Sequence, residues 1–260
     1  MEIMKDIASA DRKRLAPLFA NHHHLRPDID AVLQGYCGSA LANPEHDPRV
    51  AQLAISLITF FGGDPTHPLA RVLVEQLSGE KIIIVADSHW RALVHQVHGD
   101  RITSAPRLTY SAQHLHLDYL RQLSARVLEG FQLHRITLEL AQRIGAEVDT
   151  DLIHPEVFPS ASDFVARGIG FCALTGDQLV CGATSAARCD TAIEIQINTH
   201  PSYRQKGLAT AVGAALVTHC LEQGLYPDWE TGIDNVTSQH LAQRLGYVPG
   251  SPYEWLVLAD

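Results

Sequence analysis

A short turn between residues 204 and 210 carries the residues that are best suited to hold an anion. It reads Arg-Gln-Lys-Gly-Leu-Ala-Thr, and a segment rich in Ala and Leu follows it. The first backbone N–H groups of a helix have no partner inside the helix, and the helix dipole adds partial positive charge there. Gly207 and Ala209 let an anion approach the backbone closely. The turn therefore predicts an anion site at the start of a helix.

The stretch before this turn predicts a half-buried strand. Ile193, Ile195 and Ile197 alternate with Glu194, Gln196 and Asn198, which is the period-two pattern of such a strand. Pro201 ends the strand because proline has no N–H group for the ladder. The sequence thus indicates a strand, a sharp turn and a helix.

These residues resemble a known family. Arg204-x-x-Gly207-x-Ala209 is similar to the pyrophosphate-binding signature of the GCN5-related N-acetyltransferases (GNAT), Gln/Arg-x-x-Gly-x-Gly/Ala. The resemblance extends over roughly the C-terminal half, and the layout of the whole chain resembles the zwittermicin-resistance-type branch. It implies an α+β (α/β) fold: a C-terminal GNAT domain with a mixed, mostly antiparallel central sheet flanked by helices.

A second segment strengthens the resemblance. Asn235 precedes a helix that contains Leu241 and ends at Gly246-Tyr247, a pattern typical of GNAT proteins after their fifth strand. The resemblance implies that Asn235 hydrogen-bonds the pantetheine arm or the adjacent backbone. An ordinary helix N-cap is the alternative interpretation, and the two roles can coexist.

The resemblance implies acetyl-CoA as the acyl donor, bound along the strand, the turn and the two helix starts. Pantetheine would pair with the end of the central strand as an added strand does, and a main-chain N–H there would stabilise the oxyanion. The residues expected to contact acetyl-CoA are Ile197, Asn198, Thr199, Arg204, Gln205, Lys206, Gly207, Leu208, Ala209, Thr210, Asn235 and Ser238.

Two carboxylates are candidates for the general base. A glutamate at the position of Glu194 serves this role in several GNAT histone acetyltransferases, often through a water molecule. Glu230 follows Trp229, and this pair is similar to a Trp-Asp pair in the zwittermicin-resistance-type branch. Glu230 could bind the substrate ammonium or act as the base. A solvated or ion-paired strand glutamate is the alternative for Glu194.

The sequence departs from the family pattern at the position of the general acid, the group that protonates the departing thiolate. Many GNAT enzymes carry a tyrosine directly after the leucine of the Asn helix, but Ala242 follows Leu241 here. Tyr203, Tyr247, Ser238 and water all remain open as the group that protonates the departing thiolate.

Composition narrows the class of protein. The chain has 260 residues, 46% of them hydrophobic and 19% charged, and a formal net charge of -9. We expect a packed protein that does not bind nucleic acid, because phosphate neutralisation needs clustered Lys and Arg. No apolar run approaches the roughly 20 residues of a membrane span. The five cysteines form no Cys-x-x-Cys pair, which favours reduced thiols and a cytoplasmic location.

The pattern of residues 1–125 predicts a mixed α/β domain, in which no motif can be assigned a chemical role. Residues 126–260 are predicted to form the GNAT domain. We expect helices over 11–20, 27–33 and 68–77, and a helix, or a helix running into a strand, over 49–61. A strand over 81–86 and a helix capped by Ser88 follow. No internal repeat marks the boundary. Adjacent histidines at 22–24 are interpreted as surface residues, and no metal site is expected.

Together these features predict an N-acetyltransferase that moves an acetyl group from acetyl-CoA to a primary amine, by direct attack in a ternary complex. A small-molecule amine is the expected acceptor, which the acidic charge accommodates. The alternatives are a non-catalytic acyl-CoA-binding module, for which the missing tyrosine is the one supporting feature, and an enzyme that acetylates protein amines. Monomer and homodimer both remain open.

Overall fold

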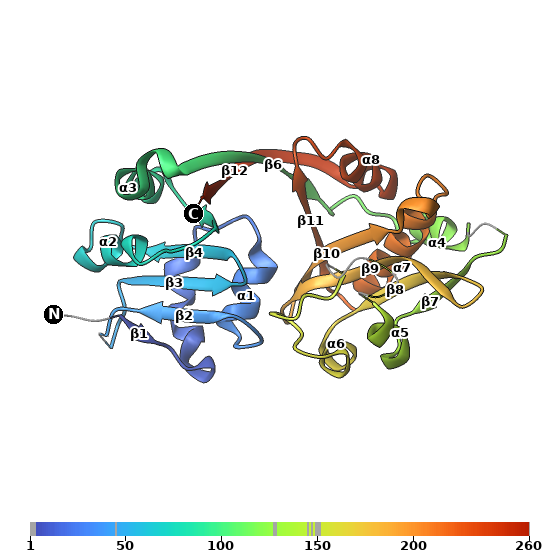
Figure 1. Cartoon of the computed structure of the whole chain (residues 1–260), viewed down its shortest axis with the longest axis horizontal. Coiled ribbons are helices and arrows are strands. Elements are labelled where there is room, and N and C mark those ends of the chain that lie inside the picture. Colours follow the sequence, from blue (N-terminus) through green and yellow to red (C-terminus); the bar gives the residue numbers. More distant parts are fainter. Residues whose placement is uncertain are drawn as a thin grey trace. The chain divides into compact units, whose positions relative to one another are not determined.

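The chain folds into two compact units, one of which is discontinuous in sequence. The computed structural model describes residues 4–44, 46–126, 129–144, 146, 148 and 152–259. The first unit comprises Met1–Arg107 and Pro252–Asp260, and the second comprises Leu108–Ser251 (Figure 1). The expected division near residue 125 differs from this one, because the first unit ends at Arg107 and also includes most of the last strand of the chain.

The first unit is a sheet with helices in its connections. Its elements are β1 (Lys5–Asp6), the 3-10 helix η1 (Ser9–Phe19), α1 (Arg26–Leu33), β2 (Ser39–Ala42), β3 (Val50–Ile55), β4 (Ile58–Gly63), α2 (Pro68–Glu75), β5 (Lys81–Val85), α3 (Ser88–His98), η2 (Gly99–Arg101) and the start of β6 (Ile102–Ser111). Strands β1 to β4 pair antiparallel in sequence order, and β4 pairs with β5 in parallel.

The second unit carries the residues of the predicted site. Its elements are α4 (Leu117–Ala125), β7 (Gln132–Arg135), α5 (Leu138–Arg143), α6 (Ala161–Arg167), β8 (Gly170–Thr175), β9 (Gln178–Arg188), β10 (Ala192–Thr199), η4 (Pro201–Tyr203), α7 (Leu208–Glu222), β11 (Tyr226–Gly232), α8 (Val236–Leu245) and the start of β12 (Val248–Leu258). Strands β7 to β10 pair antiparallel, and β10 pairs with β11 in parallel. The predicted mixed, mostly antiparallel sheet is confirmed.

The two units repeat one topology. Each half of the chain runs strand, helix, helix, three strands, helix, strand, helix and strand, from β1 to β6 and from β7 to β12. The antiparallel and parallel pairings also correspond. The final strands are exchanged, since residues 256–258 of β12 pair with residues 81–83 of β5 in the first unit. A repeat of topology therefore exists where the sequence indicated none.

The core of the second unit forms where α7 lies against β10. Leu208, Val212 and Leu216 of α7 pack with buried Ile193. Gly213 sits in the middle of this helix, where an added Cβ atom would lie 3.0 Å from the Ile197 Cδ1 atom. The glycine thus allows the helix that follows the predicted anion site to approach the strand that precedes it closely.

Three expectations for the first unit are wrong. Residues 49–61 contain no helix: residues 50–55 and 58–63 pair as the β3–β4 hairpin, and Ser56 turns the chain between them with a φ of 51°. Asp87, and not Ser88, caps α3, accepting from the His89 and Trp90 N–H groups. His22 is no surface residue: it is 3% exposed and packs against Phe19.

A helical prediction in the second unit also needs correction. The sequence pattern predicts a helix over 149–166, with Ser162 and Asp163 near a loop that faces the substrate. Residues 149–151 lie outside the described residues, and α6 begins only at Ala161, where the Ser160 hydroxyl accepts from the Asp163 N–H. Asp163 forms an ion pair with Arg167 one turn later. Asp163 therefore has a structural partner inside the helix.

Substituting Gly213 tests the packing of α7 on β10. Gly213→Val would place branched methyl groups where the Cβ alone already crowds Ile197 and Leu245. We expect a free energy of unfolding lower by about 1–3 kcal/mol, measured in urea. Gly213→Ala is the matched control and should cost less, since alanine favours helix and adds only one methyl group. Equal effects of the two variants would contradict this packing argument.

Candidate active site

The central strands of the second unit separate beside the predicted anion site. The ladder between β10 and β11 joins residues 192–194 to residues 226–228. Its last pair is Glu194 and Asp228, although β10 continues to Thr199. Strand β9 carries a register shift opposite Glu194 and Ile195, and such bulges bend strands and increase their twist. The bulge explains physically why β10 leaves β11 at this point.

The turn after β10 presents backbone N–H groups at the start of α7. Gln205 and Gly207 both adopt positive φ, at 62° and 75°. Gly207 is the N-cap of α7, and no side chain caps this helix. A Cβ on Gly207 would meet no atom within 4 Å, so the space beside the turn is open. These are the properties of a backbone anion site.

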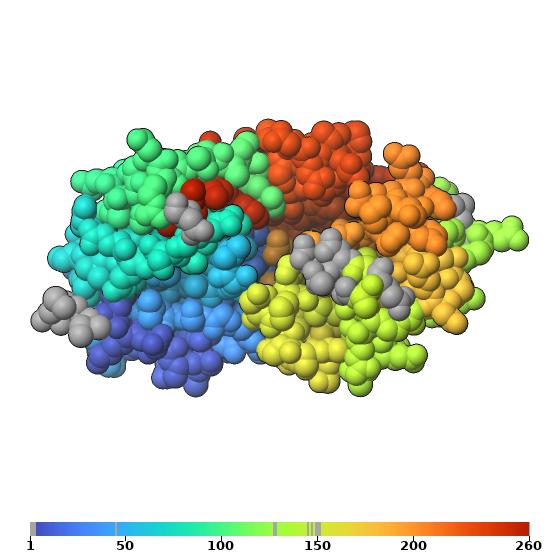
Figure 2. Space-filling model, viewed as in Figure 1, coloured from blue at the N-terminus to red at the C-terminus, as the bar shows by residue number. Residues whose placement is uncertain are grey.

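The cations of the turn are exposed. Arg204, Gln205, Lys206 and Gly207 are all exposed, and the segment around residue 200, coloured orange, reaches the surface in Figure 2. The Arg204 Nε donates to the Thr199 carbonyl oxygen at 3.2 Å, which ties the turn to the end of β10. The Lys206 Nζ lies 5.0 Å from the ring centroid of Tyr203. Both positive charges therefore remain near the start of α7.

Three carboxylates gather on β10 and β11. Glu194 and Asp228 are ladder partners, and Glu230 lies two residues further along β11, on the same face by strand alternation. Since Ile193 packs against α7, its neighbour Glu194 points to the opposite face of the sheet. Burial first, and then the charges of Glu230 and Glu194, raise the pKa of Asp228 well above its ordinary value.

The sequence reasoning missed Asp228. It singled out Glu230 and Glu194 but not the carboxylate that lies between Pro227 and Trp229. The signal was present in the alternation of β11, because Pro227 and Trp229 are buried and Asp228 and Glu230 are half-buried. A half-buried acid two positions from another acid on one strand places both on the same face.

Asn235 has the role of a helix N-cap. Its side-chain oxygen accepts from the Ser238 N–H at 3.1 Å, and its side chain is exposed at the start of α8. The Ser238 hydroxyl accepts from the Trp229 indole N–H at 3.2 Å. Because that bond uses a lone pair, the Ser238 hydrogen remains for another acceptor. Trp229 thereby links α8 to the strand that carries two of the acids.

The tyrosines considered as the general acid already have partners. The Tyr247 hydroxyl donates to the Pro227 carbonyl oxygen at 3.0 Å, and complete burial raises its pKa well above the ordinary value. The Tyr203 hydroxyl donates to Gln178 at 3.0 Å. Ala242 is fully buried in the core that contains Tyr247. Ser238 differs from these tyrosines because its hydroxyl acts as the acceptor in its bond with Trp229.

The structure brings the predicted residues together along one path. Ile197, Asn198 and Thr199 end β10, residues 204–207 form the turn, and Leu208, Ala209 and Thr210 open α7. The side chain of Leu208 is buried in the core, so this residue can offer only its backbone to a ligand. Among the residues that the structure describes, no group of three His, Cys, Asp or Glu side chains could hold a metal ion.

Comparison with known proteins agrees with this arrangement. A family model for GNAT acetyltransferases matches residues 16–256, which spans both units. A Bacillus subtilis (strain 168) protein described as uncharacterized N-acetyltransferase YdfB is 28% identical over 97% of this chain and 98% of its own length. The crystal structure of a GCN5-related N-acetyltransferase-like protein from Streptococcus suis 89/1591 covers 96% of this chain and 99% of its own, with 27% identity and a TM-score of 0.77.

A more distant structure shares the fold. A tandem GNAT protein from the clavulanic acid biosynthesis pathway has a TM-score of 0.64 at 10% identity and covers 99% of this chain and 98% of its own.

The chain belongs to the GNAT acetyltransferase family. The protein is thus an acyltransferase, as the sequence predicted, and enzymes of this family use acetyl-CoA. No helix in the described parts of the chain has the length and apolar character needed to cross a bilayer.

The carboxylate cluster predicts a measurable coupling. In Glu230→Gln the pKa of Asp228 should fall, because the variant removes a neighbouring negative charge that disfavours ionisation. Carbon-13 NMR titration of aspartate carboxyls measures the shift. Glu222→Gln is the matched control, since Glu222 pairs with Arg121 on the surface of the same unit.

The same group makes stability depend on pH. The folded pKa of Asp228 lies above the unfolded value near 3.8. Its stabilising contribution is therefore full below that pH and is lost as the pH rises through the folded pKa. Asp228→Asn should flatten this part of the stability profile, and an unchanged profile would contradict the raised pKa.

Proposed function

We propose that the protein is an acetyl-CoA-dependent N-acetyltransferase that acetylates a primary amine of a small molecule. The single observation that carries the proposal is the separation of β10 from β11 between an uncapped helix start and a cluster of carboxylates. The uncapped helix start suits a phosphorylated acetyl donor, and the carboxylate cluster suits a cationic acceptor. Their proximity to one strand supports direct transfer between two bound substrates.

The residues present fit acetyl-CoA. The N–H groups that begin α7 would hold the pyrophosphate, with Arg204 and Lys206 adding charge. The edge of β10 at Ile197, Asn198 and Thr199, beyond the ladder with β11, would hold pantetheine as an added strand. When bound, acetyl-CoA supplies the activated acetyl thioester. A main-chain N–H at the end of β10 is the proposed oxyanion donor.

The carboxylates would bind the acceptor and remove its proton. An amine attacks only in its neutral form, so a base must take a proton from the ammonium. Glu194 and Glu230 remain the candidates from the sequence, and Asp228 joins them. The raised pKa of Asp228 supports this residue as the base, since it is a stronger proton acceptor than an ordinary aspartate. The other two carboxylates would then hold the cationic substrate.

The protonation state of Cys181, a β9 cysteine close to the end of β10, supports direct transfer of the acetyl group to the amine. The Cys181 Sγ atom lies 3.0 Å from the Thr199 hydroxyl oxygen at the end of β10. Burial raises the pKa of Cys181 to about 12, which keeps it a thiol near neutral pH. A thiol is a poor nucleophile compared with a thiolate, so an acyl-cysteine route through Cys181 is disfavoured. We therefore propose a ternary complex, with the Ser238 hydroxyl as proton donor to the departing thiolate.

Assignment to the zwittermicin-resistance-type branch remains a prediction. It is supported by the two-part layout of the chain and by the Trp229-Glu230 pair. A non-catalytic acyl-CoA-binding module is the alternative that Ala242 suggests, since it replaces the family's tyrosine, but membership of the GNAT acetyltransferase family argues against it. The two candidates share the cofactor site and differ in whether acetyl transfer occurs.

Charge reversal in the turn tests cofactor binding. Arg204→Glu should weaken acetyl-CoA binding at least about tenfold in isothermal titration calorimetry, because it replaces an attractive charge near the pyrophosphate by a repulsive one. Arg135→Glu is the matched control: Arg135 is exposed, and its charge acts on His219 in the last turn of α7, away from the turn. Equal weakening in both variants would overturn the assigned site.

Neutral isosteres in the carboxylate cluster test catalysis. Loss of a general base lowers kcat by about 10²–10⁴-fold, and we expect this loss in Asp228→Asn with the Kd for acetyl-CoA unchanged. Glu194→Gln and Glu230→Gln should chiefly raise KM for the amine. Thiol release with a panel of small amines is the measurement.

The outcomes separate the candidate functions. Activity that survives all three substitutions contradicts the catalytic assignment. Binding of acetyl-CoA without transfer to any amine favours the non-catalytic module instead.

A further inference from the structure

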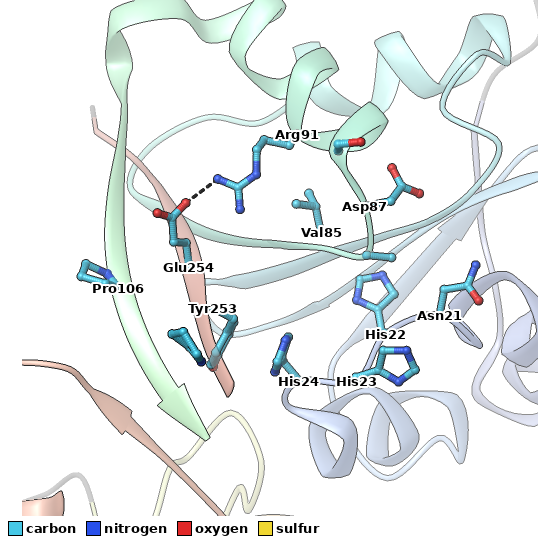
Figure 3. Close-up of a pocket in the computed structure, with 13 residues that line it drawn as sticks. Asn21, His22, His23, His24, Val85, Asp87, Arg91, Pro106, Tyr253 and Glu254 are labelled. Carbon is cyan, nitrogen blue, oxygen red and sulfur yellow. Dashed lines mark hydrogen bonds and ion pairs between the residues drawn. The ribbon is translucent and has the colours of Figure 1, made fainter. Parts of the chain in front are cut away.

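The first unit contains a cavity of its own. It has a volume of about 530 Å³ and is lined by residues 21–24, by residues 85–88 and Arg91 at the junction of β5 and α3, by Pro106, and by residues 252–254 of β12 (Figure 3). All of these residues belong to the first unit. Ligand pockets commonly have volumes of roughly 300–1,000 Å³, so the cavity is large enough for a small organic molecule.

The repeated topology allows the position of this cavity to be compared with the corresponding position in the second unit. In chain order, β5 and α3 of the first unit correspond to β11 and α8 of the second. Asp87 caps α3 as Asn235 caps α8. The cavity therefore lies at the junction that, in the second unit, follows the strand bearing Asp228 and Glu230. The first unit thus has a hollow at the junction that corresponds to the start of α8 in the second unit.

The cofactor side of the first unit lacks its counterpart. In place of the Arg-x-x-Gly-x-Ala turn, α2 begins at Pro68, and the His67 ring accepts from the Leu69 N–H at 3.2 Å. The Asp64 carboxylate already accepts from the Thr66 N–H and hydroxyl groups. A carboxylate in the turn and a proline without an N–H group both oppose pyrophosphate binding.

The strands of the first unit also stay together where β10 and β11 separate. The ladder of β4 and β5 runs from Ile58 to Phe61, whose partner Val85 is the last residue of β5. The Trp90 ring stacks on Phe61 at 5.1 Å, and its indole N–H donates to the Gly63 carbonyl oxygen at 3.1 Å. These contacts hold the end of β4 closed, so the cavity is not one half of a second acyl-transfer site.

The charged groups of the cavity leave a net negative charge. Arg91 and Glu254 form an ion pair at 2.6 Å, which neutralises both (Figure 3). Asp87 adds a further carboxylate, whose side chain is 41% exposed; its Oδ1 atom accepts from the His89 and Trp90 N–H groups and lies 3.8 Å from the His89 Nδ1 atom. The carbonyl oxygen of Phe61 can only accept, so the His22 Nε2 donates in their 2.8 Å bond. Burial lowers the pKa of His22 and of His24, which keeps both rings neutral near pH 7.

A flat aromatic surface completes the lining. The His24 and Tyr253 rings stack with centroids 3.8 Å apart and an interplanar angle of 8°. The Tyr253 hydroxyl accepts from the Trp255 indole N–H at 2.9 Å, which fixes the orientation of the phenol ring. Stacked rings attract both planar apolar groups and cations.

We propose that this cavity is a second, non-catalytic binding site that takes a small primary amine with a planar apolar body. Asp87 pairs with the ammonium group, and the stacked rings of His24 and Tyr253 contact the apolar body. The site binds without transferring an acetyl group, because the first unit has no counterpart of the anion-binding turn. Binding at this cavity is independent of the function proposed for the second unit.

Tyramine, a planar ring with one ammonium group, is a suitable probe for the full-length chain, and tyrosol is its matched control with a hydroxyl in place of the ammonium. Histidine side-chain NMR signals report on the cavity directly, through His22 and His24. We expect tyramine to shift these signals saturably and tyrosol to bind at least about fivefold more weakly, because it cannot form the charge-assisted bond.

Two variants locate the probe. Asp87→Asn keeps the helix cap, since asparagine caps as well as aspartate, and should weaken tyramine binding about five- to tenfold. Glu230→Gln in the second unit should leave the tyramine-induced shifts of His22 and His24 intact. Thermal unfolding checks that Asp87→Asn remains folded.

Three outcomes would overturn the proposal. Tyramine causes no shift of either histidine, tyrosol binds as well as tyramine, or binding survives Asp87→Asn and disappears in Glu230→Gln. The proposed acetyltransferase activity can fail or succeed independently of each of these results.

Discussion

The site depends on where the parallel pairing of β10 and β11 stops. Up to Glu194 and Asp228 the two strands share a ladder, which fixes two carboxylates side by side. Beyond that pair the bulge in β9 turns β10 away and frees one of its edges. The same strand then leads into a turn in which Gln205 and Gly207 hold positive φ. The proposed anion site, the proposed pantetheine edge and the clustered acids thus all lie beside one local break in the pairing of β10 with β11.

The two units share a scaffold and differ in the turn to which the proposed function assigns the anion site. Both units keep the same order of elements and the same parallel pair of strands, so the sheet forms in either unit despite their different turns. They differ in the turn after the fourth strand, where the first unit has Asp64 and Pro68 and the second has the open Gly207. One unit has a turn suited to phosphate and the other opposes it, although the scaffold is the same. Suitability for phosphate in this chain therefore depends on the turn that follows the strand and not on the sheet.

Sequence reasoning succeeded where a local pattern determines a local structure. The alternation of Ile193 to Asn198 located strand β10 correctly, and the family resemblance predicted the fold. It failed where distant packing decides. Residues 49–61 are apolar enough for either helix or strand, and only pairing with β2 and β5 settles the choice. The raised pKa of Asp228 likewise depends on Glu194, which lies far away in sequence and adjacent in register. The sequence did not reveal the repeat because the halves share the order of elements and the strand pairings while their motifs differ.

The exchanged strand also sets an order of events during synthesis. Residues 256–258 supply the neighbour of β5, so the first unit is completed by residues that are made only after the second unit. Until then the edge of β5 presents unpaired N–H and C=O groups, and such edges pair readily with other chains. The nascent first unit must therefore wait for the synthesis of residues 108–251 before its sheet is complete. A chain truncated before residue 252 would lose a strand from the unit at its opposite end.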